Sequence, residues 1–340
     1  MDSEDKQNLS IEEFRHIRDF IHDKSGIYFT DNKVYLLRNR LRSRMDELGL
    51  TRFNDYFYRL KYDTSRSEFN KLMVLITTNE TSFFRNEPQL RSFELEALPL
   101  VIKRIEESAR KKIIRIWSAG CSTGEEPYTL AMILKERLPK GWYGEIMACD
   151  ISEQVLSKAR RGQYHKNNIK TLQRYYRDKY FTLGDDLYTI KPEIKAMVKF
   201  SHVNLSETNK LHLFTGFDFV FCRNVMIYFS DEVKKRIVKA FYQSLNPGGF
   251  FYVGHSESLH GISKAFKLMY FKEALVYEKE GALARSERRA GASAVTPSVL
   301  ATEKVSTNSD DGFSRAMELL RKARGNVEAH RNISQSTMGR

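Results

Sequence analysis

The stretch that decides the fold is residues 113–127, which read IIRIWSAGCSTGEEP. It begins as a short apolar run typical of a strand buried on both faces, passes through a turn containing two glycines, and continues with helical spacing over 128–138. Glycine lets a backbone approach a ligand where a side chain would clash. Because doubly wound sheets bind ligands at the carboxyl ends of their strands, the turn is expected to be a binding position. Taken alone, it is equally typical of an ordinary strand-to-helix connection.

Acidic residues around this turn indicate the kind of ligand. The helix begins with Glu125 and Glu126, and two carboxylates argue against a pyrophosphate, because a second anion would be repelled there. The next strand ends at Asp150, where a carboxylate can accept two hydrogen bonds from ribose hydroxyls. A lone Asp is more often a helix cap, but its distance from the turn favours ligand binding. A neutral-to-cationic, ribose-bearing ligand points to S-adenosylmethionine rather than a dinucleotide.

Further short apolar or β-branched runs follow, separated by helical segments, at 146–149, 198–203, 217–222 and 250–254. This alternation predicts an α/β domain with a parallel sheet and crossover helices. The segment 161–196 is too long for a simple connection. It contains two strand-like runs, 180–183 and 187–190, on either side of Gly184-Asp185-Asp186, so we expect a small antiparallel β-subdomain inserted there.

The remaining chain divides by composition and periodicity. Apolar residues over 11–73 recur at spacings of three and four, which predicts a small domain of short amphipathic helices. The expected organisation is an N-terminal helical domain over 1–75, a linker over 76–92, a main domain over 93–280 with its β-subdomain at about 162–197, and a tail over 281–340. The tail is rich in Ala, Ser, Arg and Thr, which predicts disorder with one helix at 313–323.

Composition limits the class of protein. The three cysteines lack metal-site or disulfide spacing, and no apolar run approaches the length of a membrane span, so we expect a cytoplasmic, monomeric protein with no metal and no membrane insertion. The net charge of +13 raises the possibility of nucleic-acid binding. Residues 1–80 hold fourteen basic and fourteen acidic side chains, so the excess of positive charge lies after residue 80. This distribution favours a solvated basic surface, or an acidic protein partner, over nucleic-acid binding.

Six ordered motifs resemble the CheR family of chemotaxis receptor methyltransferases. They are TTNETSFFR at 77–85, STGEEPY at 122–128, CDI at 149–151, VNL at 203–205, FCRNVMIYF at 221–229 and GHSE at 254–257. The resemblance spans residues 11–280 and implies a Rossmann-like, S-adenosylmethionine-dependent methyltransferase domain with a small antiparallel β-subdomain and an N-terminal all-α domain. It also implies a bacterial signal-transduction enzyme that forms glutamyl methyl esters on the cytoplasmic helical domains of chemoreceptors, with S-adenosylhomocysteine as the second product.

The resemblance also assigns roles to individual residues. Arg85 and Tyr228 are implied as catalytic positioning residues. The cofactor would contact a larger set, in which Glu125 meets its amino group and Asp150 its ribose: Asn79, Thr81, Arg85, Glu125, Asp150, Asn204, Leu205, Arg223 and Asn224. Phe83 and Phe84 are expected to anchor the linker in the core. His255 is expected to be an ordinary loop residue, because an ionised carboxylate acceptor already is a nucleophile and requires no base.

The helix expected over 34–45 points to the partner. Its apolar stripe is flanked by four arginines, and no acidic residue occurs from Lys33 to Arg44. It is either a solvated face or a docking surface for acidic receptor helices, and we predict docking through Arg38, Arg40, Arg42 and Arg44. The hairpin expected around Gly184-Asp185-Asp186 is short, which favours recognition of the receptor without a tether. Two alternatives stay open: a nucleic-acid methyltransferase, and a signalling adaptor that binds S-adenosylmethionine without methyl transfer.

Overall fold

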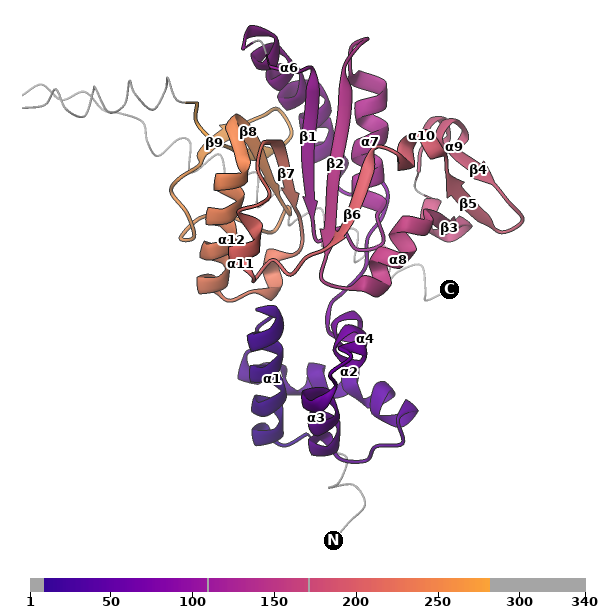
Figure 1. Ribbon diagram of the computed structural model, residues 1–340, viewed down its shortest axis with the longest axis vertical. Coiled ribbons are helices and arrows are strands. Elements are labelled where there is room, and N and C mark those ends of the chain that lie inside the picture. The colour runs from indigo at the N-terminus through magenta and orange to yellow at the C-terminus, as the bar shows by residue number, and fades with distance from the viewer. Residues whose placement is uncertain (1–8, 109, 171, 282–340) are drawn as a thin grey trace, which may run out of the picture.

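The computed structural model describes residues 9–108, 110–170 and 172–281. Two bodies are visible, a helical part near the N-terminus and a larger part built around a sheet (Figure 1). The helix predicted at 313–323, and the tail from residue 282 onward, lie outside the described residues.

Four amphipathic helices form the N-terminal body. They are α1 (Ile11–Ser25), α2 (Val34–Glu47), α3 (Phe53–Tyr62) and α4 (Ser67–Ile76), with a short 3₁₀ turn, η2 (Asp31–Lys33), before α2. Helix α1 starts at a capping box, in which Ser10 and Glu13 satisfy each other's backbone N–H groups, and ends at Gly26 in the left-handed conformation. The apolar stripes predicted from the sequence meet in one core, in which Phe14, Leu37 and Tyr56 are fully buried.

A seven-stranded sheet organises the larger body, in the order β6-β2-β1-β7-β8-β10-β9. The first five in this order are parallel: β6 (Val198–His202), β2 (Tyr143–Asp150), β1 (Ile113–Ala119), β7 (Phe217–Cys222) and β8 (Leu245–Val253). Strand β2 lies on one side of β1 and β7 on the other, so the connections diverge at the carboxyl end of β1. That topological switch point is where open α/β sheets bind ligands.

Both faces of the sheet are covered, which explains the continuous apolar character of its strands. Along β1, Ile114 and Ile116 belong to the core on one face, whereas Trp117 and Ala119 belong to the core on the other. The first face is covered by α5 (Glu87–Ser92), the π-helical turn η3 (Phe93–Ala97), α6 (Leu98–Glu107) and α7 (Glu125–Arg137). Helix α12 (Asp231–Ser244) and the short α11 (Thr208–Leu211) cover the second.

A three-stranded antiparallel sheet, in the order β3-β5-β4, forms the inserted subdomain. It comprises β3 (Gln163–His165), β4 (Phe181–Leu183) and β5 (Leu187–Ile190), with α9 (Arg174–Tyr180), α10 (Pro192–Lys195) and the turn η4 (Lys166–Ile169). It follows α8 (Glu153–Arg161) and packs beside α7 (Figure 1). The hairpin β4–β5 is where the sequence predicts it, because Gly184-Asp185-Asp186 marks a turn between two strand-like runs. Strand β3 is as short as β4 but has no such turn beside it, and the sequence does not predict it.

Two further strands were also missed, β9 (Lys267–Tyr270) and β10 (Leu275–Glu278). Both are four residues long and pair antiparallel at the edge of the main sheet. The connection between them, residues 271–274, reads FKEA and has no turn-forming Gly, Pro, Asn or Asp to mark a hairpin. The overall class is confirmed: a Rossmann-like α/β domain, a small antiparallel β-subdomain and an N-terminal all-α domain. None of the helices within the described ranges is both long and apolar enough to cross a bilayer.

Candidate cofactor and active site

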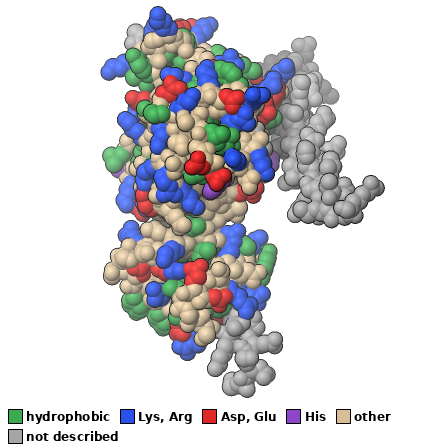
Figure 2. All heavy atoms as spheres, turned by 90° about the vertical axis from the view of Figure 1, so that its right-hand side faces the viewer, with side chains coloured by type: hydrophobic (Ala, Val, Ile, Leu, Met, Phe, Trp, Pro, Cys, Tyr) green, Lys and Arg blue, Asp and Glu red, His purple; other side chains and the backbone are tan. Residues whose placement is uncertain are grey.

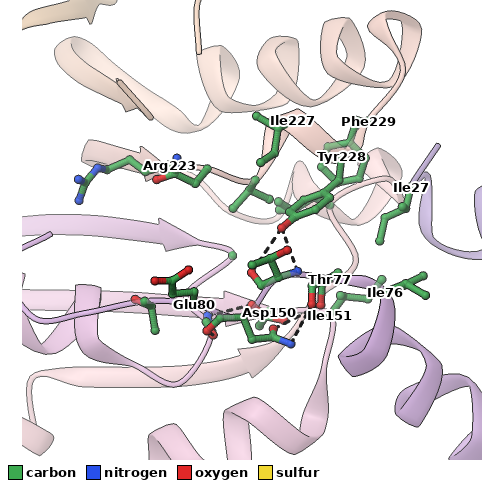
Figure 3. Close-up of a pocket in the computed structure, with 18 of the residues that line it drawn as sticks. Ile27, Ile76, Thr77, Glu80, Asp150, Ile151, Arg223, Ile227, Tyr228 and Phe229 are labelled. Carbon is green, nitrogen blue, oxygen red and sulfur yellow. Dashed lines mark hydrogen bonds between the residues drawn. The ribbon is translucent and has the colours of Figure 1, made fainter. Parts of the chain in front are cut away.

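A cavity of about 600 Å³ lies at the carboxyl ends of β1, β2 and β7. Three parts of the chain line it: the N-terminal domain with Ile27, Tyr28 and Arg40, the linker over 77–85, and the loops that leave the parallel strands. Figure 3 shows Tyr228 above the cavity and Asp150 below it, with Thr77 and Ile76 beside them. The all-α domain therefore closes one side of the site.

The turn after β1 forms the floor of the cavity. Gly120 has a φ of 78°, and a Cβ there would clash with Val225, so the close approach of these two loops requires glycine. The carboxylate of Asp150 accepts hydrogen bonds from the backbone N–H of Ser122 at 2.9 Å and of Ser152 at 3.0 Å. Burial raises the pKa of Asp150 above its ordinary value, although these N–H groups act in the opposite direction.

The two glutamates at the start of α7 face different surroundings. Glu126 lines the cavity, where it accepts from the Ser118 hydroxyl at 2.8 Å and pairs with Arg223 at 3.2 Å. Glu125 does not line it; its carboxylate is buried, accepts from the Thr123 hydroxyl at 2.7 Å, and has a pKa raised by burial. The structure thus places Glu126, rather than the expected Glu125, in contact with the cavity.

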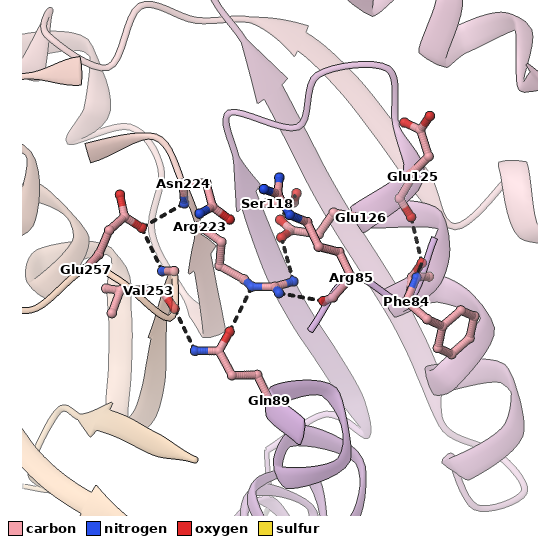
Figure 4. Close-up of polar contacts among 12 residues, drawn as sticks. Phe84, Arg85, Gln89, Ser118, Glu125, Glu126, Arg223, Asn224, Val253 and Glu257 are labelled. Atoms are coloured by element: carbon pink, nitrogen blue, oxygen red, sulfur yellow. Dashed lines mark hydrogen bonds and ion pairs between the residues drawn. The ribbon is translucent and has the colours of Figure 1, made fainter. Parts of the chain in front are cut away.

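Arg223 is buried at the cavity wall and ties three segments together (Figure 4). Besides its pair with Glu126, its Nε donates to the Gln89 side chain at 2.9 Å and its Nη2 to the carbonyl of Arg85 at 2.5 Å. Burial lowers the pKa of Arg223, and the Glu126 carboxylate opposes that effect. Gln89 continues the network to the carbonyl of Val253 at the end of β8. The linker is therefore fixed to two adjacent strand ends.

The linker carries the residues expected to contact the methionine end of the cofactor. Asn79, Thr81 and Arg85 line the cavity, and Arg85 donates to the carbonyl of Glu80 at 2.9 Å. Tyr228, at the end of the 3₁₀ turn η5 (Met226–Tyr228), is joined to the same segment through the backbone of Thr78, whose N–H donates to the phenolic oxygen at 3.0 Å.

Left-handed backbone occurs in the cavity wall and on either side of one lining residue. Of the described residues other than glycine, five have positive φ: Arg66, Phe84, Asn86, Ser122 and Asn224. Ser122 and Asn224 line the cavity, and Phe84 and Asn86 flank Arg85, which also lines it. Such conformations persist only where the surrounding structure enforces them, and they cluster at functional sites. This strain could not be read from the sequence.

The loop after β6 brings the remaining expected residues to the wall. Leu205 is buried and Asn204 is half-buried, and both line the cavity. The side-chain amide of Asn204 donates to the carbonyl of Lys24 at the end of α1, at 2.8 Å. A second link joins the two domains nearby, where the backbone N–H of Tyr28 donates to the carbonyl of Tyr228 at 2.9 Å.

The four arginines of α2 separate into two groups. Arg40 turns inward and lines the cavity, donating to the carbonyls of Leu75 and Ile76 at the end of α4 and to the Thr78 hydroxyl. Arg44 forms an ion pair with buried Glu68 at 2.8 Å. Arg42 is exposed and Arg38 is half-buried, so these two lie nearer the expected docking face.

The polar groups that line the cavity match the hydrogen-bonding groups of S-adenosylmethionine. Asp150 offers a carboxylate for ribose hydroxyls, Glu126 offers one for an ammonium group, and the glycine turn leaves room for the ligand beside the backbone. In the described part of the chain, no group of three or more His, Cys, Asp or Glu side chains could hold a metal ion. Glu126, Ser122 and Arg40 are among the lining residues that the sequence did not predict to bind the cofactor.

Comparisons with known families match both domains. Residues 79–275 match the family described as CheR methyltransferase, SAM binding domain, and residues 12–77 match CheR methyltransferase, all-alpha domain. These boundaries follow the division between the sheet-containing body and the helical body.

Whole-chain relatives agree with this assignment. The chain is 36% identical over 270 residues to Chemotaxis protein methyltransferase 2 of Vibrio cholerae, covering 78% of this chain and 92% of that protein. It is 36% identical over 270 residues to the Chemotaxis protein methyltransferase of Escherichia coli K12, covering 76% and 89%. It is 35% identical over 258 residues to that of Borreliella burgdorferi, covering 75% and 90%.

Proposed function

Because this chain belongs to the CheR family of S-adenosylmethionine-dependent methyltransferases, we propose that it methylates glutamate side chains on the cytoplasmic helices of chemoreceptors. The product would be a glutamyl methyl ester. The observation that carries this proposal is the cavity itself, which unites Asp150, Glu126, Arg223 and Tyr228 at the switch point of the sheet and opens between the two domains.

The cofactor residues in this proposal lie around one cavity. Asp150 would accept hydrogen bonds from ribose hydroxyls, and Glu126 would accept from the amino group. The other lining residues complete the wall: Asn79, Thr81, Arg85, Asn204, Leu205, Arg223 and Asn224. When bound, the cofactor supplies an electrophilic methyl group on a sulfonium.

The acceptor needs no general base in this chemistry. A glutamate side chain is ionised near pH 7 and already nucleophilic, so the protein must orient it and exclude water. Tyr228, whose phenolic oxygen accepts from the backbone N–H of Thr78, would position the reacting groups. His255 is exposed and is not among the cavity-lining residues, which supports its interpretation as a loop residue.

Receptor docking is proposed for the exposed side of α2, through Arg42 and Arg38, because acidic helices would be attracted to it. Figure 2 shows many basic side chains spread over the face of the molecule that it draws. The end of α8 also carries the exposed Lys158, Arg160 and Arg161. The edges of the subdomain sheet, β3 and β4, are each three residues long, so an added strand would gain few backbone hydrogen bonds. This favours recognition without a tether.

A single experiment tests the proposal. The protein is incubated with cofactor labelled in the transferable methyl group and with membranes containing receptors. We expect label on the receptor that is released as volatile methanol in alkali, because esters hydrolyse there. Label on nucleic acid would favour a nucleic-acid methyltransferase instead, and cofactor binding without transfer to any acceptor would favour an adaptor.

A further inference from the structure

The side chain of Glu257 spans the gap between the end of β8 and the loop that leaves β7. One carboxylate oxygen, Oε2, accepts from the backbone N–H of Asn224 and of Gly254, each at 2.7 Å. The other, Oε1, accepts from the backbone N–H of Ile227 at 3.1 Å. Figure 4 shows Glu257 beside Asn224, on the side of the network opposite Arg85. One carboxylate thus satisfies three backbone donors, yet it is not part of the cavity wall.

Two of these donors, Asn224 and Ile227, lie in the loop that leaves β7. Asn224 has a φ of 61°, a left-handed conformation that its surroundings must maintain. Ile227 is the second residue of the turn η5, so its N–H has no partner within that turn and favours an anionic acceptor. Strand β7 ends at Cys222, just before Asn224, and η5 begins at Met226, just before Ile227. Glu257 therefore holds both the left-handed backbone at Asn224 and the start of the turn η5.

Packing around the carboxylate is close. A Cβ at Gly254 would lie 2.5 Å from Glu257 Oε2 and 2.8 Å from the backbone nitrogen of Asn224. Neither contact is sterically possible, so the position requires glycine for space. The motif GHSE at 254–257 thereby acquires a physical explanation: its first residue makes room for the carboxylate of its last.

The loop held in this way delivers cavity residues at both ends. Asn224 lies at its start and Tyr228 at its end, and both line the cavity. We propose that Glu257 is a positioning residue for methyl transfer, acting through this loop to set Asn224 and Tyr228; the proposal rests on the function proposed above. It touches neither the cofactor nor the acceptor.

A carboxylate is required because all three partners are donors. In Glu257→Gln the amide oxygen can replace one carboxylate oxygen, but the NH₂ group must then face at least one backbone N–H. At least one donor of the loop loses its partner. A displacement of about 1 Å at a reacting group can reduce turnover by about a hundredfold, so a modest loop shift is measurable.

The test combines kinetics with amide hydrogen exchange. Turnover of receptor methylation is compared for the wild type, Glu257→Gln, Tyr228→Phe and the double variant, with Glu273→Gln as a control that also loses a carboxylate, one paired with Arg91 outside the cavity. We expect Glu257→Gln to lower kcat by about tenfold or more in the wild-type background and by less than about threefold in the Tyr228→Phe background. Amide exchange over 223–228 should accelerate, while exchange over 113–119 stays unchanged.

Two results would overturn the assignment: equal losses of kcat in both backgrounds, or unchanged exchange over 223–228 in Glu257→Gln. The exchange measurement needs no catalysis, so it tests the role of Glu257 even if the wild type transfers no methyl to receptors. Absence of transfer by the wild type would count against the proposed function instead. Unchanged exchange over 113–119 establishes that the variant is folded.

Discussion

The phenolic oxygen of Tyr228 accepts a hydrogen bond from the backbone N–H of Thr78 at 3.0 Å, although the two residues are 150 positions apart in the sequence. Thr78 in turn receives a hydrogen bond on its hydroxyl from Arg40 of α2 at 3.2 Å. A side chain of the N-terminal domain, the linker and the end of the turn η5 are thereby connected beside the cavity.

The change Tyr228→Phe removes the acceptor for Thr78 and leaves the ring in place. We expect turnover to fall by about fivefold, because one hydrogen bond of about 1 kcal/mol no longer fixes the acceptor side of the site. Cofactor affinity should stay within about tenfold of wild type. Calorimetric titration with S-adenosylmethionine and initial-rate kinetics check both, and unchanged turnover would discard the positioning role.

The two adjacent glutamates of α7 offer a matched pair. Glu126→Gln should weaken S-adenosylmethionine binding by about tenfold, since Glu126 lines the cavity and a charge-assisted hydrogen bond of about 1.5–3 kcal/mol is weakened. Glu125→Gln should leave the dissociation constant within about threefold, because that carboxylate meets Thr123 instead. The opposite ranking in equilibrium binding would show that Glu125 contacts the cofactor.

Acidification should weaken cofactor binding through Asp150. Burial raises the pKa of this carboxyl, so it becomes protonated at a higher pH than an ordinary aspartate as the pH falls. The protonated form accepts ribose hydrogen bonds less well, so the dissociation constant should increase as the pH is lowered from about 7 toward the ordinary aspartate pKa of about 4. Asp150→Asn should bind weakly throughout this pH range. A wild-type affinity independent of pH would contradict this role.

Arg44 should matter for stability rather than docking. Arg44→Met leaves buried Glu68 without its partner and should lower the free energy of unfolding by about 3 kcal/mol, measured by urea denaturation. Arg44 lowers the pKa of Glu68, so this contribution is complete above about pH 4.5 and disappears as the pH falls through the lowered pKa. Equal stability of variant and wild type at pH 7 would refute it.

Charge reversal on the exposed side of α2 should affect the receptor selectively. Arg38→Glu with Arg42→Glu is expected to raise the KM for receptor by about tenfold at low salt, with a smaller effect at high salt because charge attraction is screened. The dissociation constant for S-adenosylmethionine should not change. The matched control is a reversal at Arg174, an exposed residue of α9. A KM that is insensitive to salt in the wild type would argue against docking by charge.

The sequence by itself determined the local features. The apolar run, glycine turn and helix over 113–138 predicted β1 and α7, and the end of the next strand placed Asp150 at the switch point. Helical periodicity likewise predicted the N-terminal body. These features depend on residues close together in the chain. The spacing of their apolar side chains and their backbone preferences predict helix or strand without knowledge of tertiary contacts. Short strands such as β3 and β9 carry too few residues for that signal and have no glycine turn beside a second strand-like run, which is what marked β4 and β5.

Only the tertiary structure decided which of several similar side chains serve the site. Successive residues of a helix point about 100° apart, so of Glu125 and Glu126 one faces the cavity and the other the interior. The same geometry turns Arg40 and Arg44 toward α4 and leaves Arg42 exposed. Two of the three donors to Glu257, and the Tyr228 and Arg40 partners of Thr78, come from segments distant in sequence. Such contacts depend on how the elements pack against one another, which local spacing does not encode.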